Sequence, residues 1–182
     1  MGIRPSTPAP LAGHPEFALY GIRREQLDAE LQLRVCRHEL WTVASYVNGW
    51  QARFSDLALI QPTGTELARA QALARARAIA PWLAQEEANR REGLRKGYRA
   101  PTVIVRNVIS QVDGLIATPP RQSPFFAPAT RDTTPAFASE LARVVGGEIA
   151  PAMQRYRDFL ANEYLRQARE ALGVNNVFTN YT

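Results

Sequence analysis

The chain has 182 residues, of which 46% are hydrophobic and 21% charged, and its formal net charge at pH 7 is +5. This balance is typical of a globular protein with one core and excludes a disordered or fibrous chain. No apolar run approaches about eighteen residues, and basic residues alternate with acidic ones, so the sequence predicts neither a membrane nor a nucleic-acid partner.

The two ends of the chain have the composition of poorly ordered segments. Residues 1–22 are rich in Pro, Gly and small side chains and are predicted to form a flexible arm. This start has no continuous apolar core and no small-residue cleavage site, which predicts a cytoplasmic protein. A helical domain is expected over 23–173, followed by a tail over 174–182.

Residues 23–48 have the periodicity of a helix. Their main apolar seam follows a 3-4 spacing through Leu33, Cys36, Leu40, Val43, Val47 and Trp50. A second stripe of Leu27, Leu31 and Val35 predicts neighbours on two sides. Asn48-Gly49 is a stop signal, because both residues tolerate the left-handed conformation that closes a helix. We therefore expect one helix from Arg23 to Asn48.

Residues 61–97 predict a broken pair of helices. Thr63 with Glu66 fits the capping box, in which each side chain satisfies a free amide at the helix start. Pro81 lacks an amide proton and clashes with the preceding turn, so we expect a kink or a restart there. Gly97 ends the element. Acid-before-base pairs at i,i+4 spacing predict a solvated face: Glu86–Arg90 and Glu87–Arg91.

The next element begins at Pro101, which suits the first turn of a helix. Its hydrophobic residues form a wide stripe at helical spacing, made of Val105, Ile109, Val112 and Ile116 and widened by Ile104, Val108 and Leu115. Strict alternation fails beyond residues 102–105, which excludes a strand. A helix over 101–117 that is buried around much of its circumference is therefore predicted.

A Pro-rich loop or extended strap is expected over 118–135, anchored by burial of Phe125 and Phe126. A short helix over 136–146 then leads through Gly146-Gly147 to a last long helix over 149–172. The predicted fold class is all-α: an irregular multi-helix bundle of about five to six helices.

The nearest approach to a catalytic motif is the segment from His38 to Thr42. Zinc peptidases use His-Glu-x-x-His on a helix, but Thr42 stands where the second histidine is needed. The other histidine, His14, lies in the arm, so a hydrogen-bonded or interfacial role is favoured for His38. Cys36 is the only cysteine, which excludes an intramolecular disulfide and favours a small buried apolar residue.

The last helix carries two further candidates, Glu163 and Tyr164, which could contribute polar groups to a cleft. An exposed acid beside a core tyrosine is the favoured interpretation. No nucleophile elbow and no phosphate loop occur in the sequence. The sequence therefore assigns no catalytic, metal-ligating or cofactor-binding residue, and it predicts no cofactor in this chain.

A family resemblance rests on the stretches NGWQARFSDLALIQP, REGLRKGYRAPTVIVRNVISQVDGL, SPFF and IAPAMQRYRDFLANEYLRQAREALGV. In order and spacing, residues 34–173 resemble the amino-terminal half of the bacterial family known as domain of unknown function 885. The resemblance implies a helical, zincin-like, metallopeptidase-related protein. Its zinc and its His-Glu-x-x-His helix would belong to a later half that this sequence lacks. The ending GVNNVFTNYT departs from the Gly-rich, Tyr-containing stretch expected at that junction.

Two functions remain open. The first is a non-catalytic scaffold half of a zinc-metallopeptidase-like hydrolase, as a fragment, a truncated form or one part of a split enzyme, which would wall one side of a peptide cleft. The alternative is a stand-alone helical protein-interaction module without enzymatic activity. Both predict an apolar helix face that meets the missing catalytic half, another protein or a second copy of the chain.

Overall fold

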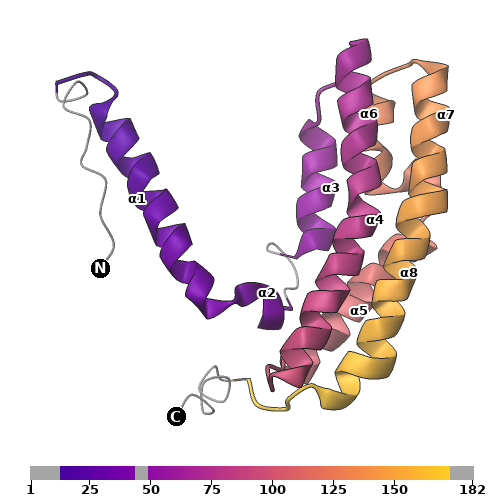
Figure 1. Ribbon diagram of the computed structural model, residues 1–182. Helices are drawn as coiled ribbons and strands as arrows, with labels where there is room; N and C mark the ends of the chain where they lie inside the picture. Colours follow the sequence, from indigo (N-terminus) through magenta and orange to yellow (C-terminus); the bar gives the residue numbers. More distant parts are fainter. Residues whose placement is uncertain (1–12, 44–48, 173–182) are drawn as a thin grey trace. The chain divides into compact units, whose positions relative to one another are not determined.

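The described part of the chain is helical. The computed structural model describes residues 13–43 and 49–172. Within these ranges, α-helices, 3-10 turns and π turns are joined by short connections, and no strand occurs (Figure 1). An isolated parallel β-bridge joins Pro101 and Arg169. The predicted all-α class is confirmed, and no described helix has the length and apolar character needed to cross a membrane.

The chain divides into two units, residues 1–38 and residues 39–182. The first contains helix α1 (Phe17–Leu33) and a 3-10 turn (Arg34–Cys36), and α1 buries none of its side chains. Helix α2 (His38–Trp41) spans the boundary between the units. The second unit contains all the longer helices that follow, together with the hydrophobic core.

The predicted single helix from Arg23 to Asn48 is wrong. Helix α1 begins at Phe17, inside the predicted arm, and Arg37 then takes a φ of 46°, in the left-handed region, which breaks the helix before α2. The expected seam is split as a result, because Leu33 is 53% exposed whereas Leu40 is buried. Residues 1–12, residues 44–48 with Val47, and the predicted tail lie outside the described residues.

One helical rod, residues 135–167, is the centre of the second unit. It consists of α7 (Pro135–Val144), a π turn (Val145–Ile149), α8 (Ala150–Phe159), a second π turn (Leu160–Tyr164) and a 3-10 turn (Leu165–Gln167). Helix α8 packs against both α4 (Glu66–Arg95) and α5 (Thr102–Ala117), and α7 also packs against α4 (Figure 1).

The interruption expected at Gly146-Gly147 does not occur. A π turn carries the helix through both glycines into α8, where Pro151 is the second residue. Pro151 has no amide to donate to the preceding turn, and the wider π turn before it accommodates this loss. The rod also ends at Gln167 rather than at residue 172. Beyond it, the Arg169 amide donates to Ala100 O at 3.1 Å, which holds the chain end against the start of α5.

Helix α4 runs unbroken for 30 residues, so the restart predicted at Pro81 is wrong. Pro81 lies on an exposed face, where water can satisfy the carbonyl that loses its donor. The predicted capping box is also displaced, because the cap is Thr65, whose Oγ1 accepts from the Ala68 amide at 3.1 Å. The stop at Gly97 is confirmed: its φ is 83°, and the next amide, of Tyr98, donates back to Gly93 O at 2.9 Å.

Helix α5 confirms the helix predicted after Pro101, although Pro101 is its N-cap and not a residue of its first turn. Val105, Val108 and Val112 are at most 1% exposed. β-branched residues disfavour a helix by only about 0.5 kcal/mol each. Burial of each valine side chain contributes roughly 1.5–3 kcal/mol. Burial therefore decides the conformation of this segment.

Two connecting segments differ from expectation. Helix α3 (Trp50–Ile60) is a helix that the sequence pattern did not reveal. The predicted strap over 118–135 folds into two 3-10 turns (Pro120–Gln122 and Pro124–Phe126) and helix α6 (Ala127–Thr130). Phe125 and Phe126 are 2% and 6% exposed, so the anchoring role predicted for these rings is confirmed.

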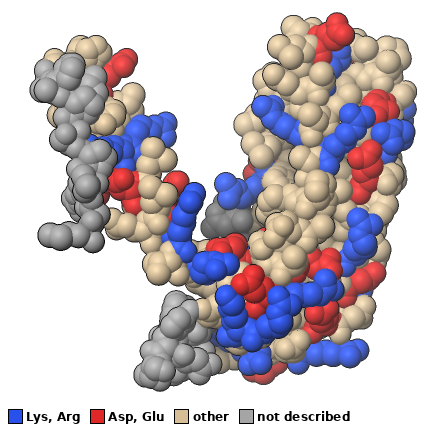
Figure 2. Space-filling view, in the orientation of Figure 1, with Lys and Arg blue, Asp and Glu red and all other residues tan. Residues whose placement is uncertain are grey.

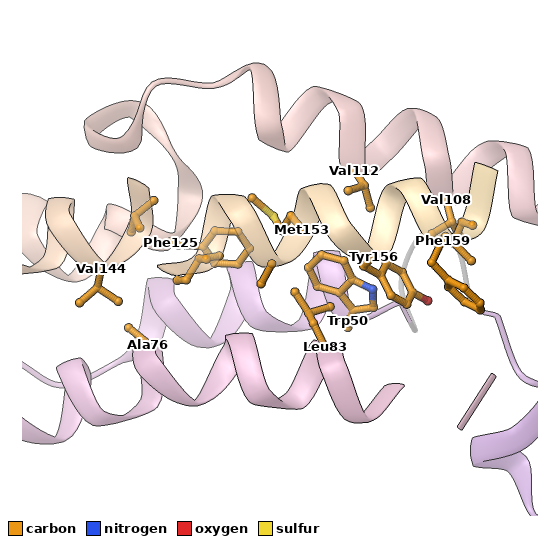
Figure 3. Packing of buried hydrophobic residues seen from close by; sticks show 14 of the residues in the cluster. Trp50, Ala76, Leu83, Val108, Val112, Phe125, Val144, Met153, Tyr156 and Phe159 are labelled. Carbon is orange, nitrogen blue, oxygen red and sulfur yellow. The ribbon is translucent and has the colours of Figure 1, made fainter. Parts of the chain in front are cut away.

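The core follows the inward face of α8. Figure 3 shows Met153, Tyr156 and Phe159 along this helix, with Val108 and Val112 of α5 beside them and Trp50 of α3 next to Tyr156. The rings of Trp50 and Tyr156 meet edge to face, with centroids 5.8 Å apart. At the other end of the cluster, Ala76 of α4, Phe125 and Val144 close the core.

Gly93 allows α4 to approach the backbone of α2. A Cβ built on Gly93 would lie 1.9 Å from Leu40 O, a backbone atom that cannot rotate away. We expect Gly93→Ala to destabilise the protein by about 1–3 kcal/mol through this overlap, measured by urea unfolding. Gly114→Ala on α5 is the control, since its Cβ would meet nothing within 4 Å. It should stabilise by roughly 0.5–1 kcal/mol, and equal effects of the two variants would contradict the close contact.

Asp132 ties the turn before α4 to the turn before α7. It accepts from the Thr134 and Gly64 amides at 3.0 and 2.9 Å and pairs with Arg69 at 3.2 Å. Hydrogen bonds from Thr134 and Gly64 hold the Asp132 pKa well below its usual range.

A carboxyl whose folded pKa is depressed stabilises the fold above its unfolded pKa of about 3.9, and this contribution disappears as the pH falls towards the folded pKa. We therefore expect Asp132→Asn to flatten the loss of stability below about pH 4, measured by unfolding at a series of pH values. Asp56→Asn, which removes an exposed carboxyl from α3, is the control. A profile for Asp132→Asn that parallels the parent would contradict the role of this carboxylate.

Candidate functional site

The His38-to-Thr42 segment begins in the short helix α2 and continues into the residues after it. His38 and Glu39 are exposed at α2, and His14 accepts a hydrogen bond from the Glu16 amide at 3.2 Å. Residues 13–43 and 49–172 contain no group of three His, Cys, Asp or Glu side chains that could hold a metal ion. A catalytic zinc needs several protein ligands and an open position for water. The described donor set does not fit that ion.

The remaining sequence candidates occupy separate environments. Cys36 is half-buried. Glu163 is 42% exposed and pairs with Arg91 at 2.9 Å. Tyr164 is fully buried, where its hydroxyl accepts from the Ala100 amide at 2.9 Å, and burial raises its pKa. Glu163 and Tyr164 therefore do not form a shared polar site.

An apolar groove lies between α3 and α4, and we call it the α3–α4 groove. It encloses about 500 Å³, and Phe125 and Leu141 are among its lining residues. Three large side chains that line it are exposed: Leu57 by 55%, Ile60 by 76% and Trp82 by 40%. Its described lining is almost entirely apolar, which is the character of a surface that packs against another apolar surface.

Polar contacts hold the two sides of this groove in place. Arg131 donates to the carbonyls of Ala58 and Gln61 at 3.1 and 2.7 Å, so it satisfies the carboxyl-terminal end of α3. Arg75 of α4 donates to the Gln61 side chain across the groove. Small residues on α4, Ala72 and Ala76, leave the space that the groove occupies.

A second cavity, of about 360 Å³, adjoins the first and contains a buried charge. We call it the Arg90 cavity. Its lining comes from the segment after α2, the first turns of α3, a stripe of α4 and Tyr156 of α8. On α4, Trp82, Glu86 and Arg90 follow each other at four-residue intervals and therefore share one face of the helix.

The solvated face predicted for this part of α4 is only partly correct. Both predicted pairs form, but the Arg90 and Glu86 side chains are 5% and 12% exposed, while Arg91 is 41% exposed. Arg90 also donates to the main-chain carbonyl of Glu39. The sequence signal that could have revealed this burial is Trp82, which lies on the same stripe as the Glu86–Arg90 pair.

Burial has opposite effects on the two main titratable groups of the cavity. It lowers the pKa of Arg90, and the neighbouring Tyr156 and Tyr164 hydroxyls oppose that change. Burial raises the pKa of the Tyr156 hydroxyl, and the Arg90 charge opposes the rise. The Trp50 indole is close enough to Tyr156 to affect the same pKa, but its Nε1–H does not reach hydrogen-bond geometry.

Several charged side chains elsewhere on the second unit form ion pairs. Figure 2 shows basic and acidic groups intermingled over the visible face. Arg143 pairs with Glu140 at 2.8 Å and holds the pKa of that carboxyl at about 2. Arg157 pairs with Asp113 at 2.8 Å. The surface therefore carries local ion pairs rather than a continuous basic patch on this face.

Comparison with known proteins gives one match. The family described as "Bacterial protein of unknown function (DUF885)" matches residues 12–177, which include α1 and every helix of the second unit. No curated protein and no solved structure matches the chain.

The donor set gives a direct expectation for metal content. We expect protein purified without a metal-binding tag to contain zinc well below one ion per chain, because His38 has no second histidine on its helix and no described three-ligand group exists. Elemental analysis measures this. Near-unit zinc that resists mild chelation and is lost in His38→Ala would contradict it.

Proposed function

The chain belongs to the DUF885 family of bacterial proteins, and from this premise we propose that it is the non-catalytic helical scaffold of a zinc-metallopeptidase-like hydrolase. Zinc and the catalytic groups would be supplied by another segment or by a partner protein. The scaffold would form one wall of a peptide cleft. This proposal is supported by the resemblance of the helical motifs to zincin-like proteins and by a described donor set that does not fit a catalytic zinc.

The α3–α4 groove is the observation that carries this proposal. A helix with an apolar face would bury Leu57, Ile60 and Trp82, each of which is at least 40% exposed in this chain. Full burial of one such side chain contributes roughly 1.5–3 kcal/mol. The proposed occupant is therefore an apolar helix of the catalytic part, seated between α3 and α4.

The alternative is a stand-alone interaction module that uses the same groove for an unrelated protein. The two functions predict different results when the chain is combined with a catalytic partner. A scaffold gains zinc-dependent peptidase activity when it meets a family segment that carries His-Glu-x-x-His, whereas an interaction module does not. A neighbouring reading frame with that motif would favour the scaffold and would supply the partner for the test.

We expect the isolated chain to bind a hydrophobic dye and to self-associate, measured by fluorescence and light scattering, because the groove is uncovered. Substituting both Leu57 and Ile60 with Lys should reduce dye binding and association severalfold. Leu67→Lys is the matched control, since Leu67 is 69% exposed on α4 and does not line the groove. A monodisperse monomer without dye binding and with a sharp cooperative melt would contradict the proposal and favour the stand-alone module.

A further inference from the structure

Buried polar atoms without partners gather at the Arg90 cavity. Thr42 Oγ1, Trp50 Nε1 and Arg90 Nε have no hydrogen-bond partner in the described structure, and all three residues line this cavity. A buried donor without an acceptor destabilises the fold, because it has lost its hydrogen bonds to water. Trp50 Nε1 and Arg90 Nε are donors only, and the Thr42 hydroxyl can donate as well. The group that would satisfy them together is therefore an acceptor.

The protein itself supplies acceptors to two of the three nitrogens of the Arg90 guanidinium. Its Nη1 donates to Glu39 O and its Nη2 to the Glu86 carboxylate, which leaves Nε–H unused. The side chain is 5% exposed, so bulk water does not replace the missing acceptor freely. Arg90 is thus a buried, charged side chain whose Nε–H has no acceptor at the cavity.

The charges around the cavity favour an anion. Among the described residues of its lining, Arg53 and Arg90 are the cations and Glu86 is the carboxylate. Glu86 is already engaged by Arg90, and Arg53 is exposed on α3 without an ion pair among the described residues. Gly49 and Trp50, at the amino-terminal end of α3, also line the cavity, and the positive end of the helix dipole adds to the attraction.

The aromatic lining of the cavity favours an anion that also carries an apolar organic group. Trp50, Phe54 and Trp82 form a connected aromatic cluster, with ring centroids 6.3 Å apart for Trp50–Phe54 and 5.0 Å apart for Phe54–Trp82. The Tyr156 ring, which belongs to the hydrophobic core, contacts the Trp50 ring edge to face (Figure 3). Flat apolar groups pack well against such faces and edges.

We propose that the Arg90 cavity binds an organic monocarboxylate, whose carboxylate accepts from Arg90 Nε, Thr42 Oγ1 and Trp50 Nε1 and whose apolar body contacts Phe54 and Trp82. A phosphate fits less well, because the guanidinium fork that phosphates prefer is already used by Glu39 and Glu86. The free acid and the carboxyl terminus of a short peptide share this chemistry. The proposal does not depend on the scaffold function, since every residue it uses belongs to this chain.

The test uses the whole 182-residue chain with 3-phenylpropionate as the first probe and 3-phenylpropionamide as its uncharged counterpart. Calorimetric titration should show saturable binding of the acid and at least tenfold weaker binding of the amide, as expected for hydrogen bonds to a charged group. In ¹⁵N-labelled protein, the acid should shift one of the three indole N–H signals downfield, and Trp50→Phe identifies that signal.

Two variants separate binding from folding. Thr42→Val removes an unpaired hydroxyl, so it should leave the melting temperature unchanged or raised while weakening the acid about tenfold. Arg53→Gln removes an exposed cation and should weaken the acid about threefold, with a smaller effect at high salt. Arg106→Gln is the matched control, because Arg106 is exposed on α5 and does not line the cavity. It should leave affinity unchanged.

The outcomes either support or overturn the assignment. No saturable binding to the folded chain, equal affinity for acid and amide, or equal weakening by Arg53→Gln and Arg106→Gln would overturn it. Tighter binding of phenyl phosphate would overturn the choice of carboxylate. If N-acetyl-alanyl-phenylalanine binds more tightly than 3-phenylpropionate, the ligand is a peptide carboxyl terminus; the reverse order identifies a free acid. Failure of these tests leaves the groove and its dye-binding test untouched.

Discussion

The residue 135–167 rod carries one continuous apolar stripe along its length, and the rest of the second unit is arranged to bury that stripe. Leu141, Val144, Ile149, Met153, Tyr156, Leu160 and Tyr164 are all at most 2% exposed along it. The apolar residues that α4 buries in the core are alanines and leucines, and those that α5 buries are valines. Side chains of this size allow both helices to pack closely against the rod. The two π turns keep the rod continuous through Gly146-Gly147 and shift which residues face inward.

Burial of Arg90 is a polar feature of this packing that contacts between apolar residues do not explain. The guanidinium joins α4 to the carbonyl of Glu39 and to Glu86, and it lies beside the Tyr156 and Tyr164 hydroxyls. Removing Glu86 would leave the buried Arg90 charge without its counter-ion, which would destabilise the fold. Arg90 and its partners therefore act as one structural unit. This unit connects the start of the second unit of the chain to its central rod.

The α3–α4 groove and the Arg90 cavity share Phe54, Leu57 and Trp82. The same edge of α3 therefore borders two unlike sites. The α3–α4 groove is an exposed apolar surface, and the Arg90 cavity contains buried donors without an acceptor. A helix placed in the groove would contact the outer side of the same aromatic cluster whose inner side lines the cavity. The proposed scaffold function and the proposed carboxylate site thus meet at these side chains.

The sequence by itself determined the helical class and the helix over 102–117, because both depend on local periodicity. It also determined the stop at Gly97, which depends on backbone preferences, and the anchoring rings of Phe125 and Phe126. Membership of the family follows from motif order. Tertiary structure decided the features in which packing outweighs local signals. Pro81 and Gly146-Gly147 are local breakers, yet the helices continue through them because both flanking segments are held in the core. The Glu86–Arg90 pair has the pattern of a solvated face, and its burial arises only when Thr42, α3 and α8 pack around it. A cavity depends on what several distant elements leave unfilled, and no local pattern contains that information.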